Sequence, residues 1–236
     1  MRILSIECSA SPASCAVIDD GKILASSYIN VKLTHSQTLM QMILDTLKNS
    51  NISLDTIKEF AVAVGPGSFT GLRIGISAIK GLAAPRSLPC VGVSTLAAMA
   101  ENFSEFDCIL CAVMDARCNQ FYNAIFDIEN GKITRLCEDR ALLADELAAE
   151  IKRISAKKRV IICGDGADLF YNNVSDIENV KVAPENIKYQ NAVGVGLYVF
   201  KNTDTVHTVS PENLLPGYLR LPQAERELKA KTEAQK

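Results

Sequence analysis

The sequence predicts an α/β protein in which one order of elements, βββαβα, occurs twice. Three observations lead to this prediction. Apolar segments of strand length alternate with segments of helical periodicity. Asp20-Gly21 and Asn130-Gly131 each stand between two apolar strands, which is a strong hairpin signal. Each half of the chain also has a Gly-x-Gly turn between a strand and a helix, so we expect two related lobes with mixed sheets.

The first copy supplies three strands, a helix, a strand and a second helix, and is expected to form an N-terminal lobe over residues 1–106. Its first strand ends at the acid Glu7. Its second helix is stopped by Pro85, because proline cannot continue a helix. The predicted elements are strands at residues 3–6, 14–18, 22–29 and 60–64 and helices at residues 36–49 and 72–84.

The second copy repeats this order and is expected to form a C-terminal lobe over residues 107–222. We expect this lobe to include a return helix near residues 190–201, and residues 223–236 to form a polar tail. The predicted elements are strands at residues 109–114 and 120–126, a strand beginning at residue 132, and helices at residues 141–154 and 193–200.

Composition is that of an ordinary globular chain of 236 residues, with 48% apolar and 22% charged residues. The formal net charge of −2 and the lack of a long basic run argue against an independent nucleic-acid-binding protein. No segment suits a signal peptide or a membrane span, so we expect a cytoplasmic protein. Its 8 cysteines are expected to be reduced, and those in apolar runs to be buried rather than metal-binding.

The most distinctive motif is the loop Gly65-Pro66-Gly67-Ser68-Phe69-Thr70-Gly71, between a predicted strand and a predicted helix. Three glycines in this loop indicate backbone that turns sharply or lies close to another group. Free amides at a helix N-terminus can bind phosphate, so Gly65, Gly67 and Ser68 are candidates for nucleotide contact. The loop is not a P-loop, because no Gly-Lys-Ser/Thr follows. Both interpretations, phosphate contact and tight packing, stay open at this point.

Acidic and small residues after the first strand of each copy are further candidates for phosphate or metal contact. They are Glu7 and Ser9 in the first copy and Asp115 in the second. A carboxylate that ends a strand and faces a cleft can hold a magnesium-bound water. Alternatively, Asp115 caps its own turn and pairs with Arg117. His35 is interpreted as a capping or packing residue, because no nucleophile or orienting partner for a general base is evident.

The two predicted helices of the first copy carry more apolar surface than one buried face requires. One side can pack on the sheet of the same lobe. The other side is either buried within the monomer or covered by another protein. Gly71 and Gly75 stand four residues apart, which allows another backbone to come close.

Further motifs accompany the glycine loop. They are Met1-Arg2-Ile3-Leu4-Ser5-Ile6-Glu7, His35-Ser36-Gln37, Lys80-Gly81-Leu82-Ala83, Gly92-Val93-Ser94-Thr95-Leu96, Met114-Asp115-Ala116-Arg117 and Pro216-Gly217-Tyr218-Leu219-Arg220. Together they resemble the bacterial TsaB (YeaZ) family of subunits for tRNA threonylcarbamoyladenosine biosynthesis, over most of the chain. The duplicated βββαβα plan likewise resembles the actin, sugar-kinase and Hsp70 superfold. The family commonly has Asp where Glu7 stands, and its C-terminal motif is tighter.

The resemblance implies a non-catalytic subunit that supports TsaD, the paralogue that transfers threonylcarbamoyl to the adenosine beside the anticodon, together with the ATPase TsaE. TsaD-type enzymes hold their metal with a His-x-x-x-His pair, and Thr95 and Met99 stand at those positions here. Neither residue replaces an imidazole, so we expect a pseudo-enzyme without a tightly bound cofactor. ATP and metal are expected on the partner subunits, and tRNA is expected to be reached only through the complex.

The resemblance also implies that the first-lobe helices form the surface for TsaD, and for a second copy of this chain when TsaD is absent. Large apolar residues near the centre of such a surface are expected to be its anchors. Ile76→Glu is expected to abolish pairing and leave the monomer folded. The expected interface residues are Leu39, Met42, Ile43, Leu72, Arg73, Ile76 and Ile79, with Arg73 as the polar anchor.

A second class of function also fits this fold. The chain could be an ATPase or kinase-like protein that binds a nucleotide weakly between its lobes, through Glu7, Asp115 and the two Gly-x-Gly turns. Thermal stabilisation by ATP and magnesium would favour this alternative, because a ligand that binds only the native state stabilises it. A peptidase is not supported, since metal ligands and a nucleophile with a base are missing.

Overall fold

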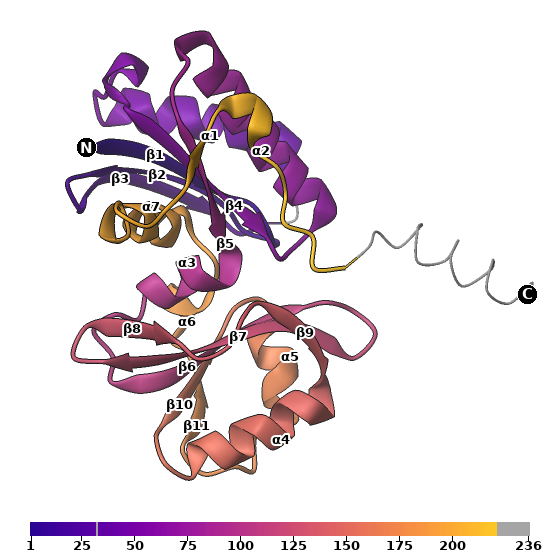
Figure 1. Cartoon of the computed structure of the whole chain (residues 1–236). Helices are drawn as coiled ribbons and strands as arrows, with labels where there is room; N and C mark the ends of the chain where they lie inside the picture. Colours follow the sequence, from indigo (N-terminus) through magenta and orange to yellow (C-terminus); the bar gives the residue numbers. More distant parts are fainter. Residues whose placement is uncertain (32, 221–236) are drawn as a thin grey trace, which may run out of the picture.

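The computed structural model describes residues 1–31 and 33–220, which form two α/β lobes (Figure 1). Each lobe is built on one mixed β-sheet with helices on its faces. The order βββαβα occurs in the first lobe, and the second lobe has the same order with one additional strand, β9 (Arg140–Leu143), before its first long helix. The predicted fold class is confirmed. No helix in the described ranges has the length and apolar character needed to cross a lipid bilayer.

A six-stranded sheet forms the first lobe. Its strands are β1 (Arg2–Glu7), β2 (Ala13–Asp19), β3 (Lys22–Ile29), β4 (Glu59–Gly65), β5 (Cys90–Ser94) and β12 (Thr208–Val209). They lie in the order β12-β5-β4-β1-β2-β3. β1 pairs antiparallel with β2 and parallel with β4, and β2 and β3 form the predicted hairpin.

Helices cover both faces of this sheet, because successive side chains of a strand point to opposite sides. α1 (His35–Asn49) and α2 (Phe69–Ala83) pack on one face, where Leu4 is buried. α7 (Ala192–Lys201) packs on the other face, where the neighbouring Ile3 is buried. In Figure 1, α1 and α2 lie on the side of the first lobe that faces away from the second.

The second lobe has a sheet in the order β11-β10-β6-β7-β8, and β9 also pairs with β7. α4 and α5 pack on one face of this sheet. α3 packs on the other face and lies between the two lobes (Figure 1). These elements are β6 (Cys108–Asp115), β7 (Gln120–Glu129), β8 (Lys132–Arg135), β9 (Arg140–Leu143), β10 (Val160–Cys163), β11 (Val180–Val182), α3 (Thr95–Glu101), α4 (Ala144–Ser155), α5 (Ala167–Tyr171) and the short α6 (Glu185–Lys188).

The helix predicted at residues 141–154 begins later than expected. Its first residues belong to β9, which pairs antiparallel with the start of β7. The partner strand lies about twenty residues away in sequence, so local helical periodicity does not reveal the pairing. The helices predicted at residues 36–49 and 193–200 are confirmed, each with small extensions at its ends.

The return helix near residues 190–201 was expected to belong to the C-terminal lobe, but α7 packs on the sheet of the first lobe. Ser5 Oγ donates to the Ala192 carbonyl at 2.7 Å, and Ala192 N donates to Ser14 Oγ at 2.8 Å. β12, from the same expected lobe, pairs with β5. An apolar helix fits either sheet, so the sequence pattern did not determine which one it covers.

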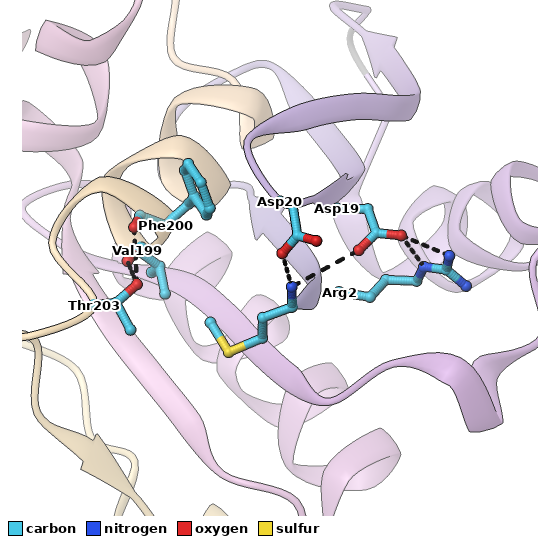
Figure 2. Close-up of polar contacts among 7 residues, drawn as sticks. Arg2, Asp19, Asp20, Val199, Phe200 and Thr203 are labelled. Atoms are coloured by element: carbon cyan, nitrogen blue, oxygen red, sulfur yellow. Dashed lines mark hydrogen bonds and ion pairs between the residues drawn. The ribbon is translucent and has the colours of Figure 1, made fainter.

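The start of β1 is tied to the turn between β2 and β3 (Figure 2). Arg2 forms an ion pair with Asp19 at 2.6 Å, and the N-terminal ammonium contacts Asp20. The end of α7 lies beside this turn, because a Cβ on Gly21 would lie 2.5 Å from the Phe200 ring. The N-terminus and the end of α7 therefore meet at one hairpin.

The cysteines of the described chain are free, as expected. Cys118 is exposed and Cys137 is half-buried. Burial raises the pKa of Cys90 to about 11, and the pKa of Cys108 likewise to about 11, so these thiols stay protonated at neutral pH. The buried cysteines are Cys8, Cys15, Cys90, Cys108, Cys111 and Cys163.

Candidate functional site

A groove of about 790 Å³ runs between α1 and α2. Apolar side chains dominate its walls: Met40 from α1 and Ile74, Ala78 and Leu82 from α2. Arg73 is the arginine on its wall. Met40 is 42% exposed although it is apolar, which is typical of a surface that binds another protein.

The groove continues into a second hollow of about 470 Å³ beside the loop before α1. His35 and Ile74 line both hollows. Val31 and Leu33 line the second one and are 52% and 55% exposed. The apolar surface therefore extends past the two helices onto the loop before α1.

The six apolar residues that the sequence suggested as interface anchors do not form this exposed surface. They are Leu39, Met42, Ile43, Leu72, Ile76 and Ile79, each at most 5% exposed. All of them except Leu72 belong to the core between these helices and the sheet. Among the six, only Leu39 also reaches the groove. Both faces of α2 are apolar, so periodicity did not show which one is buried. Ile76→Glu would place a carboxylate in the core, so from the structure we expect this variant to lose stability rather than leave the monomer folded.

The glycine loop is shaped by tight packing. A Cβ on Gly65 would lie 2.5 Å from the Gly217 carbonyl oxygen, and one on Gly67 would lie 2.5 Å from the Ser9 carbonyl oxygen. Ser68 N donates to that same Ser9 oxygen at 2.6 Å. Ser68 Oγ accepts from Gly71 N at 3.3 Å and caps α2. The amides of Ser68 and Gly71, which a phosphate could otherwise bind, are thus already hydrogen-bonded within the chain.

Gly71 and Gly75 allow a close approach, but the partner is the same chain. A Cβ on Gly71 would lie 2.1 Å from the Cys8 carbonyl oxygen, and one on Gly75 would lie 2.6 Å from Cys8 Sγ. α2 therefore lies directly on the end of β1. His35 Nε2 contacts the Ala10 carbonyl oxygen at 2.7 Å, which fits the packing role expected for it.

A cleft of about 400 Å³ lies between the lobes and brings together four of the residues expected to contact a nucleotide. They are Ser9, Gly67, Ser68 and Asp115. Glu7 and Gly65 are buried and do not line it. Asp115 Oδ1 accepts from Arg117 N at 2.8 Å, so this carboxylate caps its own turn, one of the two interpretations left open.

The cleft is acidic. Two carboxylates line it, those of Asp115 and Asp165. Burial raises the pKa of Asp165 to about 6, and Asp115 adds to the rise. Arg117 is the cation on its wall and already pairs with Asp115 at 3.1 Å. Within the described ranges, no group of three or more His, Cys, Asp and Glu side chains is arranged to hold a metal ion. The potential here therefore disfavours a bare phosphate.

The sequence placed the second Gly-x-Gly turn at a possible nucleotide site but did not single out the carboxylate of Asp165, which lines the cleft. Gln190 Nε2 donates to Asp165 Oδ1 at 2.7 Å, which fixes the carboxylate. The available signal was its position in the second Gly-x-Gly turn, where a Cβ on Gly164 would lie 2.0 Å from the Val113 carbonyl oxygen. Asp165 follows the end of the buried strand β10, just as Glu7 ends β1 and Asp115 ends β6.

Thr95 and Met99 lie one turn apart at the start and middle of α3, and both are at most 1% exposed. Met99 belongs to the apolar core between α3 and the second sheet. Ser94 caps the helix by accepting from Ala97 N at 3.1 Å. Neither a threonine hydroxyl nor a thioether is a preferred ligand where an imidazole would hold a hard catalytic metal.

Residues 214–220, which we call the strap, run along the first lobe and reach the second. Gly217 N donates to the Val64 carbonyl at 2.8 Å. Arg220 Nη1 donates to the Ala116 carbonyl, also at 2.8 Å, and so bridges the lobes. In Figure 1 the strap is the yellow segment before the grey trace.

The family model for TsaD, tRNA N6-adenosine threonylcarbamoyltransferase, matches residues 22–205. The chain belongs to the TsaD family. Among relatives in this family, the tRNA threonylcarbamoyladenosine biosynthesis protein TsaB of Bacillus subtilis is 28% identical over 95% of this chain and 96% of its own length. TsaB of Escherichia coli is 36% identical over 64% of this chain and 65% of its own length.

The structural comparison shows a shared fold. YeaZ from Pseudomonas aeruginosa superimposes with a TM-score of 0.76 at 24% identity, over 92% of this chain and 99% of that one. The resemblance to TsaB (YeaZ) is confirmed by these relatives, and the fold is that of YeaZ.

Proposed function

We propose that this chain is a subunit of the assembly that makes threonylcarbamoyladenosine in tRNA, and that it binds a TsaD-type catalytic subunit through the groove between α1 and α2. The observation that supports binding is the exposed apolar groove on a lobe whose core is already complete. The similarity to TsaB along nearly the whole chain supports the pathway. The role places the protein in the cytoplasm, where tRNA is modified.

In this proposal the chain itself transfers no group. Thr95 and Met99, packed in the core, offer no metal ligands where the catalytic paralogue is expected to have histidines. ATP and metal would then be held by the TsaD-type subunit and a TsaE-type ATPase, and tRNA would be reached through the complex. A second copy of the chain would occupy the groove when the TsaD-type subunit is absent.

Reconstitution tests this function. Purified TsaD- and TsaE-type proteins, tRNA, ATP and threonylcarbamoyl-adenylate are combined with and without this chain, and modified adenosine is measured. Modification is expected to depend on the chain and to be lost with Met40→Glu, in the groove. Leu169→Glu is the matched control, because Leu169 is similarly exposed, at 53%, on the distant α5. Modification that proceeds equally well without the chain would contradict the proposal.

A nucleotide between the lobes is the second candidate. It is favoured by the cleft of about 400 Å³, which brings Ser9 and Asp115 together. The acidic lining means that a nucleotide would need a cation to accompany it. A rise in the unfolding temperature with ATP and magnesium, but not with magnesium alone, would support this candidate. An unchanged unfolding temperature would leave the binding role as the sole proposal.

A further inference from the structure

Arg73 is held at the groove by the strap. Arg73 Nε donates to the Tyr218 hydroxyl at 2.8 Å. The Tyr218 ring in turn packs on the Phe69 ring, with centroids 4.7 Å apart. Tyr218, 145 positions from Arg73 in sequence, thereby fixes the guanidinium of Arg73 on the groove wall. The side chain of Arg73 is exposed, so this order is not a result of burial.

The rest of the guanidinium is available to a partner. Within the described ranges, Arg73 forms no ion pair and its two Nη atoms donate no hydrogen bond. Arg73 Cζ lies 5.7 Å from the centroid of the Tyr218 ring, so Tyr218 engages one side of the guanidinium and leaves the N–H groups of its two Nη atoms for a partner. A guanidinium edge of this kind matches the two oxygens of a carboxylate.

The groove itself supplies no carboxylate. Neither its lining nor α2 contains an acidic residue. α1 contains one, Asp45, which accepts from Gln41 outside the groove at 2.9 Å. A second copy of this chain would therefore bring another arginine on α2, which repels the first. Charge complementarity favours a different protein as the occupant.

We propose that Tyr218 is a positioning residue that presents Arg73 to one carboxylate on a partner helix whose contact face is otherwise apolar. The inference rests on the proposed function, in which the partner is the TsaD-type subunit. Apolar contact along the groove supplies affinity, and the ion pair at Arg73 selects the partner and its register. The strap, which the sequence showed only as a motif, thus takes part in recognition.

Calorimetric binding to the purified TsaD-type subunit tests the inference. Arg73→Met keeps the aliphatic stem and is expected to weaken binding by about 30-fold, as for loss of one partner of a desolvated charge pair. Tyr218→Phe keeps the ring on Phe69 and is expected to weaken binding about fivefold. Arg86→Met is the matched control, because Arg86 follows α2 but pairs with Asp55 outside the groove.

A double variant separates positioning from a structural role. If Tyr218 acts through Arg73, Tyr218→Phe has no further effect on binding in the Arg73→Met background. Additive losses would overturn the positioning role. Self-association, measured by sedimentation, is expected not to weaken with Arg73→Met, and an equal loss there would overturn the assignment to a foreign carboxylate.

The remaining outcomes separate the two proposals. If the unaltered chain binds the TsaD-type subunit and Arg73→Met binds equally well, this inference falls and the proposed function stands. If the unaltered chain does not bind that subunit, the proposed function falls and this inference falls with it.

Discussion

At the residue scale, Glu7 carries an energetic cost at neutral pH. Its carboxyl lies at the end of β1, where Ser9 N donates to Oε1 at 2.5 Å, and burial raises its pKa from 4.5 to about 7. Below pH 4.5 the group is protonated in the folded and the unfolded chain. Between pH 4.5 and about 7 only the unfolded chain releases the proton, so stability falls as the pH rises. Above that range the loss stays at about 3 kcal/mol.

We therefore predict that Glu7→Gln flattens this pH dependence. The free energy of unfolding by urea, measured at pH 5 and pH 7.5, should fall less between these values in the variant than in the unaltered chain. Asp165, whose pKa burial also raises, to about 6, should account for the slope that remains. Glu105→Gln, at an exposed position, serves as the control. An unchanged slope in Glu7→Gln would show that Glu7 titrates normally.

Two glycines of α2 make a matched pair. Gly71→Ala places a Cβ 2.1 Å from the Cys8 carbonyl oxygen, and the backbone must move, so we predict a loss of about 3 kcal/mol in the free energy of unfolding. Gly81 lies in the same helix, but a Cβ added there by Gly81→Ala would have no neighbouring atom within 4 Å. It should leave the protein unchanged or stabilise it by up to about 1 kcal/mol. Equal effects in urea unfolding would contradict the packing role of Gly71.

At the scale of elements, α1 and α2 each divide into a core side and a groove side. We predict that Ile76→Glu unfolds the protein or costs at least about 4 kcal/mol, because Ile76 is 5% exposed in the core. Met40→Glu, at an exposed position, should change stability by less than about 0.5 kcal/mol and abolish binding of the TsaD-type subunit. Thermal unfolding followed by circular dichroism measures the stability of both variants, and co-elution with the TsaD-type subunit measures their binding. Co-elution of Met40→Glu would contradict the groove as the contact.

Most elements could be predicted because their signals are local. The Asp20-Gly21 turn and the periodicity of α1 depend on neighbouring residues alone. The boundary at β9 was missed because its pairing with β7 is a tertiary contact. For the groove, sequence located the two helices and Arg73, but the apolar anchors that it named on α2 are buried. Both faces of that helix are apolar, and only packing decides which one the sheet covers.

At the scale of the whole molecule, the placement of α7 and of the strap depends on contacts between distant segments. Asp115 could be predicted to cap its turn, because Arg117 lies two residues away. The contact of Arg220 with Ala116 spans 104 residues and left no local signal. We predict that Arg220→Met speeds hydrogen exchange at the cleft wall near Ala116, with Leu169→Met as the control. Unchanged exchange would mean that the strap does not hold the lobes together.

The contact of α7 with the first sheet has a consequence for synthesis on the ribosome. The first lobe contains both the earliest strand, β1, and a helix that ends at Lys201, so its second face stays uncovered until most of the chain has been made. The second sheet, in contrast, uses one continuous stretch from Cys108 to Val182. The half translated first is therefore completed last, and until then a nascent chain exposes Ile3 and its neighbours to chaperones and proteases.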